Sequence, residues 1–180
     1  MVEQAMRRAV PEVAGQPFQL APALTRFVLR AQVSSAGPLL SGRVPLSPVN
    51  CRSASLGEWH ALWLGPDEQL LIGPDGRSDE LPARVVPALG GVPHSLVDIS
   101  HRQCAIEIKG PLAIALVNAG CPLDLDEAAF PVGACTRTIF AKTEIVLWRR
   151  DNEHWHVEVW RSFVPYLTGF LAVVAQEYGA

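Results

Sequence analysis

The chain has 180 residues, of which 49% are apolar and 18% are charged, and its net charge is -3. This composition allows a real core in one domain or in two small lobes, and it excludes a disordered chain. No run of Lys and Arg offers a surface to nucleic acid, and no apolar stretch approaches the roughly 20 residues that span a bilayer.

The N-terminal region predicts an irregular arm followed by one strand. Residues 1–20 mix Pro, Gly, Gln and small residues without periodicity, so we expect an irregular N-terminal arm there. Residues 25–33 alternate apolar and polar side chains, which favours a strand with one wet face. Residues 34–48 are rich in Pro, Gly and Ser and leave little room for a helix.

A hairpin and a helix follow. Residues 60–64 and 69–72 are short apolar runs joined by Gly-Pro-Asp-Glu, a tight-turn sequence, and they predict a β-hairpin. Residues 78–89 start with a Ser cap and acidic residues, which favours a helix. Pro82 and Pro87 argue against one long regular helix. Residues 94–99 predict another strand.

The second half repeats this plan. It predicts strands at 104–108, 135–141, 143–147 and 154–160, a short helix at 112–118, and an amphipathic helix at 162–178. Two successive strand-helix-hairpin-helix units indicate an α+β fold made of two ferredoxin-like (βαββαβ-type) halves packed together. We therefore expect a single domain over residues 21–180, with halves at about 21–100 and 101–180.

No known catalytic or cofactor motif is present. The sequence contains no Gly-rich phosphate loop, no Gly-x-Ser-x-Gly and no His-Glu-x-x-His. The four cysteines are widely scattered, which predicts buried or half-buried thiols and no zinc site. We therefore expect no catalytic, cofactor-binding or metal-binding residue in this chain.

Two groups of polar residues are candidate sites. His154 and His156 stand two apart in a strand and so share one face of the sheet. An exposed or interface pair is favoured over a metal site, because a metal site needs more ligands than this pair supplies. Asp98, Ser100 and His101 have the residue types of a catalytic triad. Turn capping and buried hydrogen bonds are the favoured roles there, because a strand directs neighbouring side chains to opposite faces.

The arginines and aromatic residues near the C-terminus predict a protein interface. Arg and Trp are enriched at interfaces, where they stack and form paired hydrogen bonds, although Trp in the core under Arg stems is the plain alternative. A charged fraction below the usual quarter also favours a surface covered by a partner. The expected interface residues are Arg137, Trp160, Arg161 and Phe163.

Four blocks in order resemble the sarcosine oxidase gamma subunit family. They are ALWLGPDEQLL at 61–71, SLVDISHRQ at 95–103 with the strand and Pro111 after it, GCPLDL at 120–125 with FPVGACTRT at 130–138, and EVWRSFVPYL at 158–167. The resemblance runs from about residue 58 to the C-terminus. It departs from the family at Ala134, where Thr is more usual.

The resemblance implies a fold similar to the folate-binding domain of the glycine-cleavage aminomethyltransferase. It also implies a non-catalytic subunit of a heterotetramer that oxidatively demethylates sarcosine to glycine, forms peroxide and passes the one-carbon unit to tetrahydrofolate. The partners would be the alpha, beta and delta subunits. They would hold FAD, FMN, NAD, tetrahydrofolate and zinc, and this chain would hold none of them.

A stand-alone folate-binding or aminomethyltransferase-like protein is the alternative, with Asp98, Glu144 or Glu158 as the acidic residue for the pterin. A generic interaction module is a third hypothesis, which the four ordered blocks disfavour. Since Arg7 and Arg8 precede no apolar segment, we expect no secretory signal and a cytoplasmic location.

Overall fold

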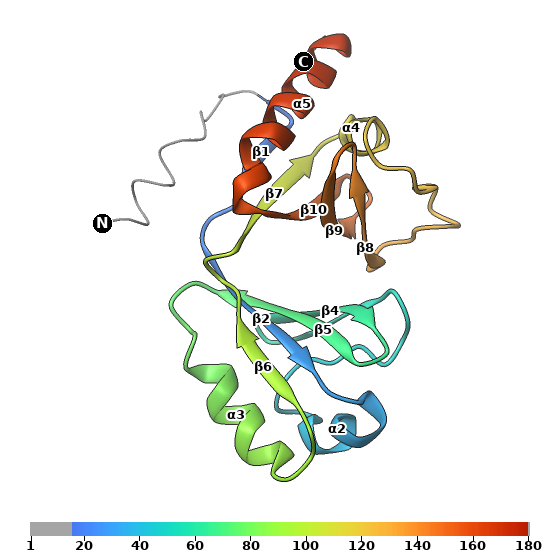
Figure 1. The fold of residues 1–180 in the computed structure, drawn as a ribbon. Coiled ribbons are helices and arrows are strands. Elements are labelled where there is room, and N and C mark those ends of the chain that lie inside the picture. The colour runs from blue at the N-terminus through green and yellow to red at the C-terminus, as the bar shows by residue number, and fades with distance from the viewer. Residues whose placement is uncertain (1–15, 180) are drawn as a thin grey trace.

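Residues 16–179 are described by a computed structural model, in which two five-stranded sheets lie face to face (Figure 1). Helices cover the outer side of each sheet, so the molecule has four layers. All strand pairs are antiparallel. The expected α+β class with two packed halves is confirmed. Within the described residues, no helix is long and apolar enough to cross a membrane.

The first half forms one sheet with strand order β3-β4-β5-β2-β6. Its elements are β2 (Leu24–Arg30), α2 (Val33–Leu40), β3 (Ser53–Leu56), β4 (Trp59–Gly65), β5 (Glu68–Pro74), α3 (Glu80–Leu89) and β6 (Ser95–Asp98). The predicted hairpin is confirmed as β4 and β5, which pair through Trp63 and Gln69 and shift register at the turn.

The second half forms a sheet with strand order β1-β7-β10-β9-β8. Its elements are β1 (Phe18–Leu20), β7 (Gln103–Lys109), α4 (Ala113–Asn118), β8 (Cys135–Phe140), β9 (Thr143–Asp151), β10 (His154–Trp160), the 3-10 helix η1 (Arg161–Phe163) and α5 (Val164–Glu177). The predicted helix at 162–178 is thus a short 3-10 turn continuing into α5.

The two halves have the same connectivity, apart from one exchanged strand. In the first half, the chain order β2-α2-β3-β4-β5-α3 ends in β6, which pairs with β2. In the second half, β7-α4-β8-β9-β10-α5 follows the same order, but the position beside β7 is filled by β1 from the start of the chain. Each sheet therefore has the four strands of the βαββαβ arrangement plus one extra edge strand, β3 or β8, but in the second half the fourth strand comes from the start of the chain. The chain crosses between sheets twice, at 21–23 and 99–102.

Three sequence-based expectations were wrong in detail. Phe18–Leu20 is a strand and not part of an irregular arm, because its backbone pairs with Ile106–Ile108; residues 1–15 lie outside the described residues. Residues 34–48 do contain a helix, α2, because Ala36 and Leu40 are one turn apart and both are buried against the sheet. Burial of these side chains outweighs the weak helix propensity of the segment.

The third difference concerns α3, which runs unbroken through both prolines. Pro82 lies in the first turn, where a missing N–H costs no intrahelical bond. Pro87 lies in the last turn, where Leu81, Val85 and Leu89 have already placed one face of the helix in the core. Asp79, not Ser78, is the residue before the helix, and it makes no side-chain cap.

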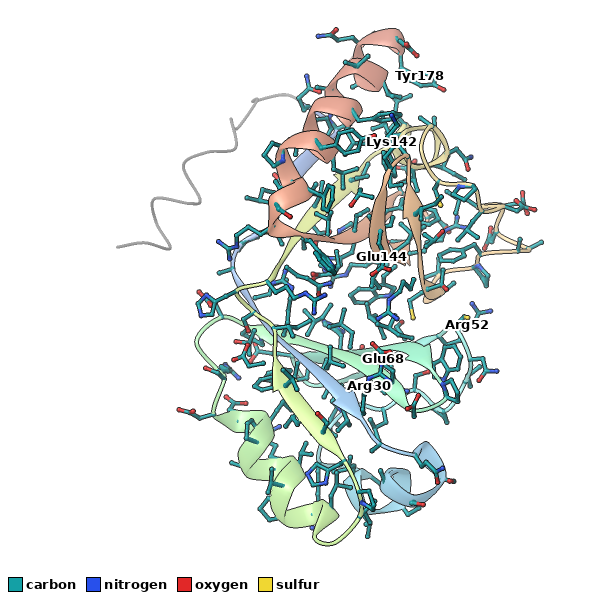
Figure 2. All side chains as sticks on the ribbon, viewed as in Figure 1. Arg30, Arg52, Glu68, Lys142, Glu144 and Tyr178 are labelled. Carbon is teal, nitrogen blue, oxygen red and sulfur yellow. The ribbon has the colours of Figure 1, made fainter. Side chains whose placement is uncertain are left out.

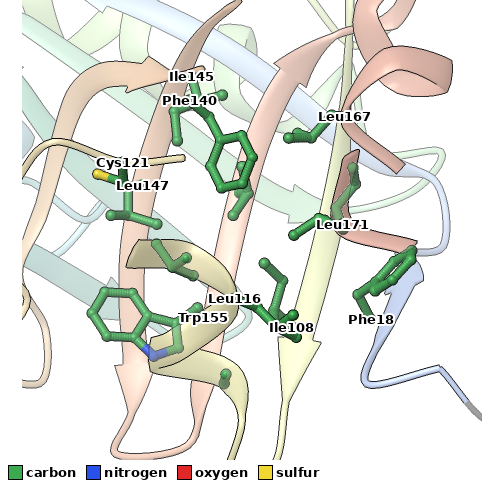
Figure 3. Close-up of a cluster of buried hydrophobic side chains, with 14 of the residues drawn as sticks. Phe18, Ile108, Leu116, Cys121, Phe140, Ile145, Leu147, Trp155, Leu167 and Leu171 are labelled. Atoms are coloured by element: carbon green, nitrogen blue, oxygen red, sulfur yellow. The ribbon is translucent and has the colours of Figure 1, made fainter. Parts of the chain in front are cut away.

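Three apolar clusters fill the spaces between the four layers. The largest lies between the second sheet and helices α4 and α5, and Figure 3 shows Trp155, Phe140 and Leu171 within it. A second lies between the first sheet and helices α2 and α3. The third lies between the two sheets and is the smallest; its buried members are Leu62, Leu70, Ile72, Cys135, Val146 and Trp148. Charged side chains also enter this layer between the sheets.

Candidate functional site between the two sheets

Charged side chains enter the layer between the sheets because strands alternate their faces. On β10, Trp155, Val157 and Val159 point into the large core, so the alternate residues of the strand point toward the other sheet. These alternate residues are His154, His156, Glu158 and Trp160. The prediction that His154 and His156 share a face is therefore confirmed.

Glu107 on β7 binds both histidines. Its Oε1 lies 2.7 Å from His156 Nδ1, and its Oε2 meets His154 Nε2. Arg150 lies near the same carboxylate, with Nη1 3.8 Å from Oε1. Burial disfavours the ionised carboxylate, but the hydrogen bonds and charges of His156 and His154 outweigh it and lower the pKa of Glu107 to about 2. The carboxylate therefore stays ionised.

His156 lies between two carboxylates. Its second ring nitrogen, Nε2, is 2.9 Å from Glu158 Oε1, and the side chain is fully buried. A ring that donates to carboxylates from both nitrogens carries two protons and is a cation. Burial opposes the charge, but the hydrogen bonds to Glu107 and Glu158 raise the pKa of His156.

Glu158 continues this chain of charges to the first sheet. Arg26 on β2 donates from Nε to both of its carboxylate oxygens, at 2.9 and 2.7 Å. Burial would raise the pKa of Glu158, but the charge of Arg26 and the hydrogen bond from His156 lower it. Arg26 also donates from Nη1 to the carbonyl of Leu24 at 3.0 Å. Alternating positive and negative groups thus link the sheets, and each of these four buried groups, Glu107, His156, Glu158 and Arg26, has a partner of opposite sign.

The expected exposed or interface role of the histidine pair was wrong for His156. The prediction missed Glu107 and Arg26, because they come from other strands that lie far from His156 and Glu158 in the chain. The available signal was the acid Glu107 in the segment 104–108, which is otherwise apolar. Within residues 16–179, no group of three or more His, Cys, Asp or Glu side chains is arranged to hold a metal ion.

A second ionic contact joins the sheets at the side of the layer. Glu68 on β5 is nearly buried, and each of its oxygens accepts a 2.7 Å bond from an arginine. Arg30 comes from the same sheet and Arg137 from β8 of the other. Arg137 also lies 3.7 Å from Glu144. Figure 2 shows Arg30 and Glu68 on one sheet and Glu144 on the other, around the space between the sheets.

The four residues expected at an interface fall into two places. Trp160, Arg161 and Phe163 lie together where β10 ends and α5 begins, and Trp160 and Phe163 are each 39% exposed. The guanidinium of Arg102 stacks over Trp160 at 4.2 Å, and Arg161 donates from Nε to the carbonyl of His101. Arg137 is held by Glu68, but it lines the same pocket between the sheets as Trp160.

Other tryptophans and arginines of this region belong to the core. Trp155 is fully buried, and Arg149 lies beside it and donates from Nη1 to the carbonyl of Phe130 at 2.8 Å. Trp148 is buried beneath Arg150, 4.7 Å from the guanidinium. The plain alternative, Trp covered by Arg stems, therefore holds for these residues.

Asp98 and Ser100 support the chain crossing between sheets. The amide of Ser100 donates to Asp98 Oδ1 at 2.8 Å, and Ser100 Oγ accepts from the amide of Arg26 at 2.9 Å. The expected role in turn capping and hydrogen bonding is confirmed. Of the cysteines, Cys121 and Cys135 are buried as expected, but Cys51 is exposed.

Comparison with known proteins gives a consistent result. A model described as "Sarcosine oxidase, gamma subunit family" matches residues 41–177. The sarcosine oxidase gamma subunit of Corynebacterium sp. (strain P-1) is 35% identical over 119 residues, which cover 66% of this chain and 58% of the relative. That of Arthrobacter sp. is 40% identical over 96 residues, covering 53% and 46%. The match thus spans about half the length of these relatives.

Two solved structures are similar in fold. One is a chain of the heterotetrameric sarcosine oxidase from Corynebacterium sp. U-96 in complex with pyrrole 2-carboxylate, with a TM-score of 0.82 and 28% identity over 98% of this chain and 92% of that chain. The other is glycine cleavage system aminomethyltransferase T from Bartonella henselae, with a TM-score of 0.65 and 11% identity over 86% of this chain and 44% of that chain. The second likeness is one of fold alone.

Proposed function

Because the chain belongs to the sarcosine oxidase gamma subunit family, we propose that it is the gamma subunit of a heterotetrameric sarcosine oxidase and that it serves the assembly of that enzyme. The observation that carries the proposal is the similarity to a chain of such a heterotetramer over 98% of this chain, at a TM-score of 0.82. The chain's role is structural, and none of its residues is assigned to catalysis.

The assembled enzyme would oxidatively demethylate sarcosine to glycine, form peroxide and transfer the one-carbon unit to tetrahydrofolate. Alpha, beta and delta subunits would be the partners and would hold FAD, FMN, NAD, tetrahydrofolate and zinc. The cytoplasm would be its location. These assignments are what the family resemblance implies; the names of the relatives support only the gamma subunit identity.

The proposed contact with a partner subunit includes Trp160, Arg161, Phe163 and Arg137. The two exposed aromatic rings lie close together in sequence at the start of α5, and Tyr166, one turn further on, is also 39% exposed. Exposed aromatic residues with a neighbouring arginine are the side chains that dominate binding at many interfaces. The solvent-facing part of α5 carries no charge until Glu177, which lowers the cost of removing it from water.

A stand-alone folate-binding protein is not favoured. The relatives with significant identity are gamma subunits, and the aminomethyltransferase is similar in fold only. Of the acids considered for a pterin, Glu158 is buried and already bonded to Arg26 and His156. Because this carboxylate already forms these bonds inside the protein, it is not accessible to a pterin.

The proposal is tested by purifying the tagged full-length chain from its native cells and measuring flavin absorbance and sarcosine-dependent peroxide formation in the eluate. A yellow eluate with three further subunits and activity is the expected result. A colourless chain that elutes alone, from cells that oxidise sarcosine, would contradict it.

The interface is tested in the same cells with Trp160→Ala combined with Phe163→Ser. We expect recovery of the partner subunits to fall at least about tenfold, while the melting temperature of the isolated chain changes little. Val86→Ser is the matched control, since Val86 is 50% exposed on α3 in the other half. Normal recovery with the double variant, or loss of its fold, would show that these rings do not form the contact.

A further inference from the structure

A pocket of about 420 Å³ lies between the two sheets. It adjoins the third apolar cluster, the small core between the sheets that includes Leu70 and Val146. Its apolar lining comes from both sheets and includes Val28, Leu70 and Val97 on one side and Val146 on the other. Leu70 and Val146 also belong to the small core, so the pocket begins where the packing between the sheets stops. Its volume lies within the range of small-molecule sites, at about 300–1,000 Å³.

The charges around the pocket favour an anion. The lining contains three guanidinium groups, of Arg30, Arg102 and Arg137, and two carboxylates, of Glu68 and Glu144, which leaves a net charge of +1. Glu68 is engaged on both oxygens by Arg30 and Arg137. Arg102 differs, because within residues 16–179 its guanidinium has no acidic partner and stacks on Trp160.

An amide inside the same lining also lacks a partner. The side-chain oxygen of Gln103 is buried, and no hydrogen bond satisfies it within the described structure. A buried polar atom left in this state costs about 1–3 kcal/mol. Because Gln103 lines this pocket, a turn of its side chain would bring the oxygen to an N–H or O–H group on a ligand, which would recover part of that cost.

We propose that this pocket binds a small organic monocarboxylate with a flat apolar body. The carboxylate pairs with Arg102, the apolar body lies against Val28, Leu70 and Val146, and a donor on the ligand reaches Gln103. The net charge of +1 matches a single negative charge better than a phosphate, and the slot between two sheets suits a flat group. The pocket shares Arg137 and Trp160 with the proposed partner contact, so it is tested in the full-length chain on its own, where a failure of binding leaves the assembly proposal untouched.

The test is calorimetric titration of the full-length chain with 3-phenyllactate, which carries a carboxylate, a hydroxyl donor and a flat ring. The matched probes are its neutral amide, 3-phenyllactamide, and 3-phenylpropionate, which lacks the hydroxyl. We expect the amide to bind about tenfold or more weakly, as the loss of one charged contact predicts, and 3-phenylpropionate to bind more weakly by a smaller factor.

Arg102→Gln should weaken binding of 3-phenyllactate to the level of the amide. Arg43→Gln is the control, because Arg43 is an exposed arginine in the loop after α2 and does not line the pocket. Melting temperatures of both variants establish that they are folded. Equal binding of acid and amide, equal binding by both variants, or no heat with any probe would overturn the proposal.

Discussion

Arg26 and Glu158 are 132 residues apart in sequence, yet they form an ion pair between the two sheets, with Arg26 Nε 2.7 Å from the nearer carboxylate oxygen. Their side chains are 3% and 0% exposed. Removing two charges from water costs several kcal/mol each, so the pair adds little net stability by itself. It acts against misalignment, because any shift of one sheet over the other leaves a charge buried and unpaired.

Removal of one partner should therefore be costly. We expect Arg26→Met to lower the free energy of unfolding by about 3–5 kcal/mol, since Glu158 would stay fully buried with only His156, a cation that it shares with Glu107. Urea unfolding followed by tryptophan fluorescence measures this change. Arg30→Met is the control: its side chain is 54% exposed and Glu68 keeps Arg137, so the loss should be below about 1 kcal/mol. Similar losses in both variants would contradict the buried charge chain.

Stability should fall on both sides of a pH window. The pKa of His156 is raised from 6.5, so its contribution is complete below about 6.5 and is lost as pH rises through the folded value. The pKa of Glu107 is lowered from 4.5 to about 2, so its contribution is complete above 4.5 and is lost as pH falls toward about 2.

Urea unfolding measured from pH 3 to pH 9 tests this window, with the maximum expected between the two ordinary pKa values. His156→Gln should remove most of the decline on the alkaline side. His94→Gln is the control, because His94 lies in the loop before β6, where its Nδ1 is 2.8 Å from the carbonyl oxygen of Val92. An unchanged alkaline decline in the His156 variant would show that another group causes it.

Close packing requires a glycine at one position and leaves another free to change. A Cβ at Gly120 would lie 2.5 Å from the ring of Phe140, which is fully buried, whereas a Cβ at Gly169 on α5 would meet nothing within 4 Å. We expect Gly120→Ala to destabilise the fold by about 1–3 kcal/mol through overpacking. Gly169→Ala should instead stabilise it by up to about 1 kcal/mol, because Ala is the better helix former. Thermal unfolding compares the two, and the same sign for both would contradict the packing at Gly120.

The cysteines should differ in reactivity. Burial raises the pKa of Cys135 to about 12, so almost no thiolate forms there at pH 8, whereas Cys51 is exposed. Iodoacetamide followed by peptide mass spectrometry should therefore modify Cys51 well before Cys135 in the folded chain. In urea both should react at similar rates. Early modification of Cys135 without urea would show that the contact between β8 and the first sheet opens readily.

Local sequence patterns are sufficient to predict most elements and the faces of the strands. The alternation in 154–160 correctly placed His154 and His156 on one face, and the apolar spacing of 162–178 predicted the C-terminal helix, because both patterns depend only on local backbone geometry. The four ordered blocks are sufficient to identify the family. The exposed rings of Trp160 and Phe163 also fit the expectation of a surface, although their contact with a partner stays a prediction.

Which residues lie opposite each face of a strand depends instead on the tertiary structure. The period of a strand tells which residues share a side, but Glu107 and Arg26 reach His156 and Glu158 through strands that are distant in the chain. The same holds for Phe18–Leu20, whose three residues form a strand because they pair with the edge of β7. Both the strand pairing of β1 and the ion pairs between the sheets join residues that are far apart in the chain. They form only when long segments of chain fold back on each other, and such long-range partners leave no periodic pattern in the sequence.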